Sequence, residues 1–291
     1  MSQSVISRPL SRIRLRRLQT NSYLIIGLTI IIALLLFGFV GPLLVNTDLA
    51  NVGANLPKLS PDGEHWLGTD TQGRDVFTVL VLATPRTLII GLLAGILGVG
   101  LGLILGVTSG YMGGTVDSAV RVLADVFMTI PAIAILIVVA TNVRSMTVGL
   151  MALIIALLAW RLPTRSIRAQ TLSLRERAYI QVAKLNGVGD FEIIVKELLP
   201  NLLPYIAATF VSTVSWAILT TIGLEALGLG PQNELTLGMM IYWAQFYGAI
   251  LRGFWWWWMP PIVVIALIFI GLFFTSAGMD QLVNIRLRKV A

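Results

Sequence analysis

Residues 23–45 read YLIIGLTIIIALLLFGFVGPLLV and contain no acidic or basic side chain. A helix needs about 20 predominantly apolar residues to cross the hydrocarbon core of a bilayer. The apolar core of a cleaved signal peptide is shorter, about 7–15 residues, and is followed by small residues at the cleavage site. Residues 45–47 (VNT) do not fit such a site, so we interpret the run as a retained transmembrane helix.

Five more apolar segments follow this first one. They cover approximately residues 87–110, 122–141, 146–160, 203–224 and 255–277. The chain is 56% hydrophobic and 12% charged, with a mean hydropathy of +0.86. A soluble domain carries about 25% charged residues. The sequence therefore predicts an all-α polytopic membrane protein with six transmembrane helices.

The basic residues predict the orientation of these helices. With the N-terminus inside, 16 of the 21 Lys and Arg residues fall on the cytoplasmic side, as the positive-inside rule requires. Both termini are then cytoplasmic. The predicted segments are a basic cytoplasmic segment (1–22), helix 1 (23–45), an extracytoplasmic loop (46–85), a five-helix core (86–280) that contains a cytoplasmic loop (161–200), and a cytoplasmic tail (281–291).

Composition excludes most kinds of catalytic site. There is no cysteine, and His65 is the single histidine, so thiolate metal sites, cysteine nucleophiles and histidine clusters are excluded or nearly so. The chain also has no phosphate-binding P-loop. We therefore expect no enzyme activity, no metal and no cofactor on this chain, and an energy source that lies elsewhere.

The basic loop contains a hairpin pattern, ERAYIQVAKLNGVGDFEIIVKELLPN, at residues 176–201. Residues 178–186 favour a helix, and Gly187 stands where a left-handed residue ends one. Asp190 is a candidate N-cap for a second helix over residues 191–199. The sequence thus predicts a helix–glycine–helix hairpin at the inner face of the membrane.

This hairpin resembles the cytoplasmic loop of ABC-importer permeases, E-A-A-x-x-x-G followed by Leu-Pro. Gln181 and Val182 depart from the first two letters of the motif, whereas Ala183 and Gly187 keep the third letter and the glycine. In that family the loop is the coupling helix that fits a groove on a separate ATPase subunit. Taken alone, Gly187 is better explained as a simple helix stop, whereas within this hairpin, followed by Leu199 and Pro200, the coupling role is favoured. The resemblance implies the following ATPase-coupling residues: Tyr179, Gln181, Val182, Ala183, Gly187, Asp190, Leu199 and Pro200.

A second match narrows the family. Residues 65–75, HWLGTDTQGRD, resemble the H-P-L-G-T-D-x-x-G-R-D signature of the dipeptide/oligopeptide/nickel branch, with Trp66 in place of proline. Residues 110–114, 227–230 and 286–288 follow the same branch. The resemblance implies the type I ABC importer permease fold in the cytoplasmic (inner) membrane. It also implies a second homologous permease subunit, two ATPase subunits that hold ATP and Mg, and an extracytoplasmic substrate-binding protein, with no nucleic-acid partner.

We expect two sets of signature residues to have structural roles. In the outer loop we expect hydrogen bonds and ion pairs from Gly68, Thr69, Asp70, Gly73, Arg74 and Asp75. His65 beside them is a nickel ligand in the alternative interpretation, although a lone histidine is a weak metal signal. Asp117, Arg121 and Asp125 lie four residues apart and predict ion pairing along one helix face. The alternative role for these three is to relay motion from the ATPase.

The candidate residues of the translocation path are Trp216, Thr221, Glu225 and Asn233. Glu225 enters this set because an ionisable group near a span is a functional hypothesis by default. The tryptophan run at residues 255–258 is typical of the membrane interface, where the indole ring has an apolar body and a polar N–H. Its alternative role is a platform on which sugar rings stack.

The function predicted from these observations is a permease subunit that moves short oligopeptides by alternating access. Departures from the branch at Thr221, Glu225 and Ala226, together with the tryptophan run, keep oligosaccharides as an alternative, with nickel less favoured. A secondary transporter predicts inverted repeats and acidic residues inside the spans. The spans carry almost no acidic residues and show no repeat, so this class is disfavoured.

Overall fold

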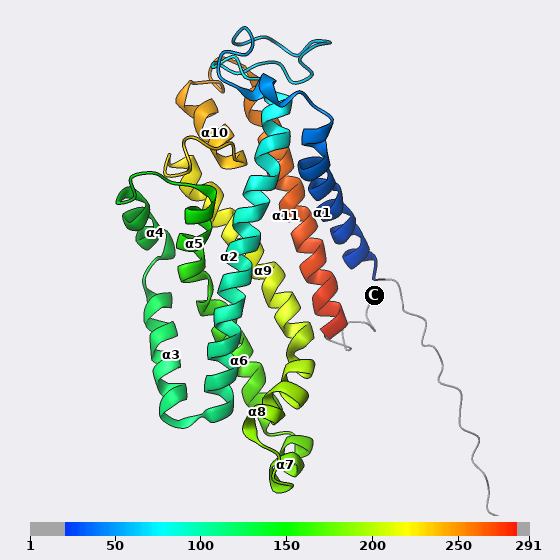
Figure 1. Ribbon diagram of the computed structural model, residues 1–291, viewed down its shortest axis with the longest axis vertical. Helices are drawn as coiled ribbons and strands as arrows, with labels where there is room; N and C mark the ends of the chain where they lie inside the picture. Colours follow the sequence, from blue (N-terminus) through cyan, green and yellow to red (C-terminus); the bar gives the residue numbers. More distant parts are fainter. Residues whose placement is uncertain (1–20, 284–291) are drawn as a thin grey trace, which may run out of the picture.

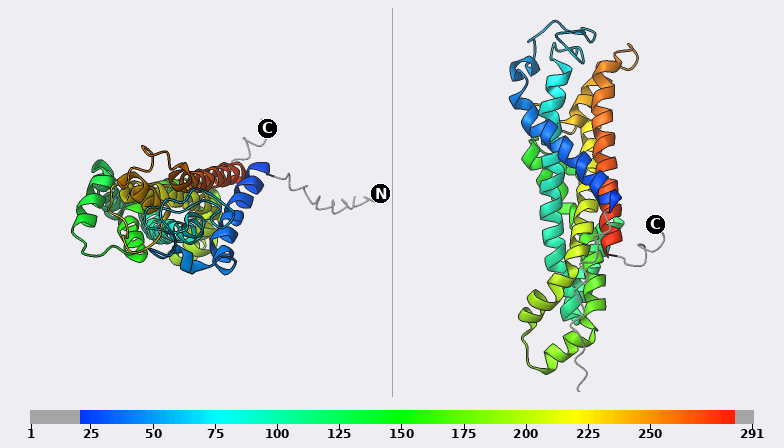
Figure 2. Two further views of the ribbon diagram at one scale, coloured as in Figure 1. Left: turned by 90° about the horizontal axis from the view of Figure 1, so that it is seen from above. Right: turned by 90° about the vertical axis from the view of Figure 1, so that its right-hand side faces the viewer.

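The computed structural model describes residues 21–283, and within this range the chain is entirely helical, without a strand. The helices form an elongated bundle (Figure 1), and Figure 2 shows the same bundle from above and from the side. The loop before α2 and helix α10 lie at one end of the bundle, and helix α7 lies at the other (Figure 1). The predictions for residues 1–20 and 284–291, including the 286–288 match, fall outside the described residues.

The helices follow one another with few long connections. Their bounds are α1 Ser22–Val40, η1 Gly41–Leu43, η2 Thr47–Ala50, α2 Val76–Met112, α3 Gly114–Thr129, α4 Ala132–Thr141, α5 Val148–Ala159, α6 Arg161–Arg175, α7 Ala178–Leu185, α8 Asp190–Ile193, η3 Ile194–Leu198, α9 Leu199–Ala226, α10 Leu237–Phe246 and α11 Trp255–Val283. Among them η1 and η2 are 3-10 turns, and η3 is a π-helical turn that joins α8 to α9.

Four helical stretches are long and apolar enough to cross a membrane, and two bent helix pairs raise the count to six. In the first pair, α3 and α4 meet at 76° around Pro131. Proline disfavours the helical region for the residue before it, and Ile130 is accordingly extended. In the second pair, α5 and α6 meet at 41°. These six segments agree with the six predicted spans.

Helix α2 begins earlier than predicted, inside the segment assigned to the outer loop. Asp75 caps it, because its carboxylate accepts from the Thr78 amide at 2.8 Å and from the Thr78 hydroxyl at 2.7 Å. Pro85 lies within the helix and packs against Gly38 of α1. At 1.5 Å per residue the 37 residues of α2 extend roughly 55 Å, well beyond a hydrocarbon core of about 30 Å.

Glycines on α2 allow close approach to its neighbours. A Cβ at Gly98 or at Gly102 would stand only 2.5 Å from the Cβ atoms of Ala159 and Pro163 respectively. Gly100, in contrast, has no atom near enough to meet a Cβ. The stripe Gly98, Gly102, Gly106 and Gly110 faces α5 and α6, and the pair Gly91 and Gly95 faces α9. Small residues at this spacing let helix backbones pack closely in lipid.

The glycine stripe explains why the predicted cytoplasmic loop 161–200 starts as a helix. Helix α6 buries Pro163, Thr164, Ile167 and Thr171 against α2, although its mean composition is polar. Its arginines led the sequence prediction to assign it to a loop. The structure instead continues the fourth span through α6, and only residues after Arg175 form the hairpin.

The outer loop before α2 is held by its signature residues. The Asp70 carboxylate accepts from Arg74 Nε at 2.6 Å and from the Arg74 amide at 3.0 Å. His65 Nδ1 lies 3.0 Å from Asp75 Oδ1, and the Thr69 hydroxyl donates to the Leu56 carbonyl at 2.6 Å. The turns at Gly68 and Gly73 have φ of 61° and 73°, a conformation that glycine adopts without steric cost.

The tryptophan run packs onto this loop and onto α10. Trp256 Nε1 donates to the Thr69 carbonyl at 3.4 Å, and Trp257 is 2% exposed and stacks on Tyr247 with ring centroids 6.0 Å apart. Trp255 is half exposed at the start of α11. Of the four indoles, Trp257 is therefore enclosed by protein, whereas Trp255 stays half exposed.

Candidate functional site

The hairpin of residues 178–198 lies at the end of the bundle opposite the signature loop (Figure 1). Helix α7 ends at Leu185, and Gly187 follows it with φ of 76°, the left-handed conformation that the sequence predicted. Asp190 does not cap the second helix. Gly189 is the N-cap, and Asp190 is the first residue of α8. From there the chain runs through η3 into α9 without a break at Pro200.

The two faces of the hairpin differ in character. Ile180, Ile193 and Leu198 are fully buried against the ends of α2 and α6. On the outside, Val182, Leu185 and Phe191 expose 54%, 88% and 80% of their surface. Exposed apolar side chains gathered at one tip are typical of a protein interaction site.

Tyr111 near the end of α2 joins both arms of the hairpin. Its hydroxyl donates to Asp190 Oδ1 at 2.6 Å, and the Lys184 ammonium lies over its ring, 4.6 Å from the centroid. Of the other motif residues, Gln181 donates to the Arg175 carbonyl at 3.1 Å, and Asn201 Nδ2 lies 3.4 Å from the Tyr179 hydroxyl. The hairpin is therefore held to the long helix that runs the length of the bundle.

Asp117 pairs with a different partner from the one predicted. Its carboxylate accepts from Arg168 Nε and, at 2.6 Å, from Arg168 Nη2, which joins α3 to α6. Arg121 and Asp125 belong to no ion pair within residues 21–283, and they border a recess beside Arg168. The ion pairing expected along one face of α3 is thus replaced by an ion pair between α3 and α6.

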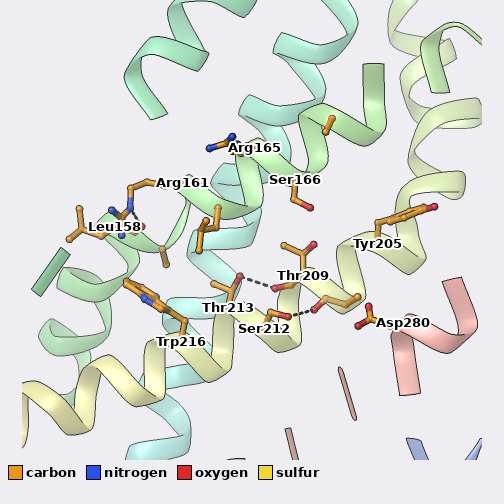
Figure 3. Close-up of a pocket in the computed structure, with 14 residues that line it drawn as sticks. Leu158, Arg161, Arg165, Ser166, Tyr205, Thr209, Ser212, Thr213, Trp216 and Asp280 are labelled. Atoms are coloured by element: carbon orange, nitrogen blue, oxygen red, sulfur yellow. Dashed lines mark hydrogen bonds between the residues drawn. The ribbon is translucent and has the colours of Figure 1, made fainter. Parts of the chain in front are cut away.

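A cavity of about 570 Å³ opens between the α5–α6 bend, α9 and the end of α11. Figure 3 shows its lining. The polar groups that reach it are hydroxyls and three charged side chains: Ser166, Tyr205, Thr209, Ser212, Thr213, Arg161, Arg165 and Asp280. Ser212 and Thr213 also donate to carbonyl oxygens of their own helix at 3.1 and 2.8 Å. The cavity is large enough for a small solute.

Arg161 is the buried cation of this cavity. It is 7% exposed, its Nε donates to the Leu158 carbonyl at 2.7 Å, and its Nη1 donates to the Phe127 carbonyl at 2.6 Å. Its guanidinium lies 5.8 Å from the ring centroid of Trp216, within cation–π range. A charge inside a span is costly unless it is bonded in this way.

The four predicted path residues do not come together. Trp216 lines the cavity, whereas Asn233 lines a separate recess near the outer loop. Thr221 is buried and its hydroxyl donates to the Ala217 carbonyl at 2.9 Å. Glu225 is fully buried. Its side chain packs against Gly230 and against Gly238, which lies at the start of α10. The hypothesis that Glu225 faces a translocation path is therefore incorrect for this conformation.

Sequence reasoning did not select Arg161, Tyr205 or Asp280. Arg161 carried a usable signal, because it is the first charged residue after an apolar run and so was bound to lie at a membrane boundary. Asp280 lies near the predicted tail and has no motif around it. Tyr205 and Asp280 line the same cavity as Arg161 only because α9 and α11 pack together, which no local pattern predicts.

Comparisons with known proteins agree with this architecture. Residues 98–289 match the family described as binding-protein-dependent transport system inner membrane component. The dipeptide transport system permease protein DppC of Bacillus subtilis (strain 168) is 31% identical over 277 residues, covering 94% of this chain and 85% of that protein. The nickel transport system permease protein NikC of Escherichia coli (strain K12) is 34% identical over 194 residues, covering 65% and 68%. The oligopeptide transport system permease protein OppC of Mycobacterium tuberculosis (strain ATCC 25618 / H37Rv) is 27% identical and covers 78% of each chain.

The fold is also found among solved structures. An inward-facing structure of the MetNI methionine ABC transporter contains a chain that superimposes with a TM-score of 0.57 at 19% identity, covering 70% of this chain and 94% of that one. The predicted type I importer permease fold is thereby confirmed. With most of its length matched by the family and by its relatives, the chain belongs to the binding-protein-dependent transport system inner membrane components, the multi-pass permease subunits of ABC importers.

Proposed function

We propose that this chain is one of two homologous permease subunits in an ATP-driven importer of short peptides. The observation that carries the proposal is the hairpin at the inner end, which presents Val182, Leu185 and Phe191 to the outside. An apolar tip on a rigidly held loop suits the groove of a separate ATPase subunit. ATP and Mg bind to that subunit, and this chain supplies movement without covalent chemistry.

The partners on the outer side follow from the family. A substrate-binding protein delivers the solute to the end that carries residues 46–75, and the hairpin, Arg165, Arg168 and Arg175 face the cytoplasm. This orientation places the described inner arginines on the side that the positive-inside rule requires. The coupling residues are Tyr179, Gln181, Val182, Ala183, Gly187, Asp190, Leu199 and Pro200. Trp216 is the path residue that we retain from the sequence prediction.

Peptides are the substrate class that the relatives favour, because the permeases named DppC and OppC serve dipeptide and oligopeptide systems. The oligosaccharide alternative finds no support in the relatives described above. Nickel stays a second candidate because NikC is 34% identical. His65, however, pairs with Asp75, and no group of three or more His, Cys, Asp or Glu side chains suited to a metal occurs in residues 21–283.

The test is purification of the tagged chain in mild detergent with its native complex, followed by reconstitution into liposomes. We expect a second permease and ATPase subunits to co-purify, and a labelled dipeptide to accumulate only with ATP and the binding protein. Uptake of nickel but not of peptide would favour the second candidate. Recovery of the chain alone, with uptake driven by an ion gradient, would refute the importer proposal.

A further inference from the structure

The positively and the negatively charged side chains of the main cavity lie on opposite sides of it. Arg161 and Arg165 lie on one side of the cavity and Asp280 lies on the other, with Ser166 and Thr209 between them (Figure 3). The arginines come from α6, and Asp280 comes from the last turns of α11. Asp280 is the one carboxylate in the lining, and no ion pair among residues 21–283 includes it or either arginine.

The arginine side of the cavity is shaped for an anion. Arg161 is nine-tenths buried and uses Nε and one terminal nitrogen on carbonyl oxygens, while its positive charge has no carboxylate beside it. Arg165 follows one turn later, is exposed and is among the lining residues, and its Nη1 lies 3.9 Å from Met128 Sδ on α3. Guanidinium groups bind carboxylates through paired, charge-assisted hydrogen bonds. A carboxylate of a solute would therefore be held here and compensate the buried charge.

The opposite side and the wall complete a site for a zwitterion. Asp280 is exposed and lines the cavity, and its carboxylate can accept hydrogen bonds from an ammonium group. Between the two sides, the hydroxyls of Tyr205, Thr209 and Ser166 can each donate to a peptide carbonyl or accept from a peptide amide. Apart from Ser212 and Thr213, the remaining lining consists of apolar side chains, among them Leu158, Leu162 and Trp216.

We propose that this cavity binds a short peptide in transit by its two free ends, the α-carboxylate at Arg161 and Arg165 and the α-ammonium at Asp280. The proposal rests on the peptide-importer function and adds the contacts that recognise the substrate inside the membrane. All unmodified short peptides share these ends and the main-chain amides. The cavity thus accepts many sequences while excluding solutes that lack both charges.

The test compares peptides whose ends are blocked. The complete transporter is reconstituted with its binding protein, and each peptide is supplied at a concentration that saturates the binding protein. Two ratios are measured: uptake of a free dipeptide relative to its N-acetylated form, and uptake of the free dipeptide relative to its C-amidated form. The variants are Asp280→Asn and Arg165→Gln. Arg161 is left intact because it also bonds to two main-chain carbonyls. The matched control is Arg144→Gln, which lies in an exposed loop and does not line the cavity.

We expect Asp280→Asn to lower the ratio of free to N-acetylated peptide uptake roughly three- to tenfold, a range typical of one partly solvated charge-assisted bond. Arg165→Gln should lower the ratio of free to C-amidated uptake by a similar factor, and the Arg144→Gln control should change neither ratio. Because the binding protein is the same throughout, its own preference cancels between variants.

Three results overturn the inference. If both variants keep the wild-type ratios while the wild type imports peptide, the cavity does not bind the peptide ends. The importer function is then unaffected. A zwitterionic phospholipid headgroup offers the same pair of charges. Unchanged ratios combined with loss of co-purifying phospholipid from Asp280→Asn, measured by mass spectrometry, would assign the cavity to lipid. A wild type that imports no peptide at all removes the proposed function together with this site.

Discussion

Arg161 donates to the main-chain carbonyl of Phe127 at 2.6 Å, across 34 positions of sequence. Phe127 lies near the end of α3, before the 76° bend into α4, and Arg161 lies at the 41° bend between α5 and α6. The same guanidinium bonds to the Leu158 carbonyl at the end of α5. One side chain therefore joins the bends of two different spans and satisfies carbonyl groups that the helix ends leave free.

Arg161→Gln should destabilise the folded protein and reduce ATP-driven uptake. Each hydrogen bond from a charged donor contributes about 1.5–3 kcal/mol, and glutamine cannot reach both carbonyls with one planar fork. Arg161→Lys should fall between the wild type and Arg161→Gln. The melting temperature in detergent measures the first effect, with Arg144→Gln as the exposed control. Equal melting temperatures for Arg161→Gln and the wild type would contradict the bridging role.

Gly102→Ala should lower the melting temperature, whereas Gly100→Ala should not. A Cβ at Gly102 would press within 2.5 Å of Pro163 Cβ, so α2 and α6 must move apart. Overpacking of this kind costs about 1–3 kcal/mol. Gly100 lies two residues earlier on the same helix and faces open space, so alanine there keeps the packing and improves helix propensity. The two substituted positions lie within one helical turn of each other. An equal decrease in melting temperature for both variants would rule out the packing explanation.

Substitution of Gly187 should impair coupling without unfolding the bundle. A side chain in the left-handed conformation costs about 1–2 kcal/mol, and nothing lies near enough to add a steric clash. Asparagine tolerates this conformation better than β-branched residues, so uptake should decrease from wild type to Gly187→Asn to Gly187→Val. Gly189 has φ of −67° and equally open surroundings, which makes Gly189→Ala the control. The rate of peptide uptake per ATP hydrolysed in liposomes measures the effect.

Glu225→Gln should retain peptide uptake, because Glu225 is buried at the junction of α9 and α10 and does not line the main cavity. Gly238→Ala should lower the melting temperature instead, since its new Cβ would occupy the space of the Glu225 side chain. Uptake and melting temperature are measured on the same preparations. A stable Glu225→Gln protein that has lost uptake would return this residue to the path.

Local features were predictable because they depend on residues near one another in the chain. The apolar runs, the left-handed glycine at position 187 and the hydrogen-bonded loop at residues 65–75 all follow from hydropathy, helix capping and turn chemistry. Helix α6 was missed for a related reason. Its polar composition resembles a loop, and the glycines of α2 that turn it into a packed helix lie about sixty positions earlier.

By itself the sequence determined the membrane class, the positions of the apolar helices and the helix–glycine–helix hairpin, because hydrophobic length and backbone preference act over one helix at a time. Only the tertiary structure decided which charges meet. Asp117 bonds to Arg168 and not to Arg121, Glu225 is enclosed, and Arg161 shares a cavity with Asp280. Those outcomes depend on how the spans bend and cross, which is set by packing between helices distant in sequence.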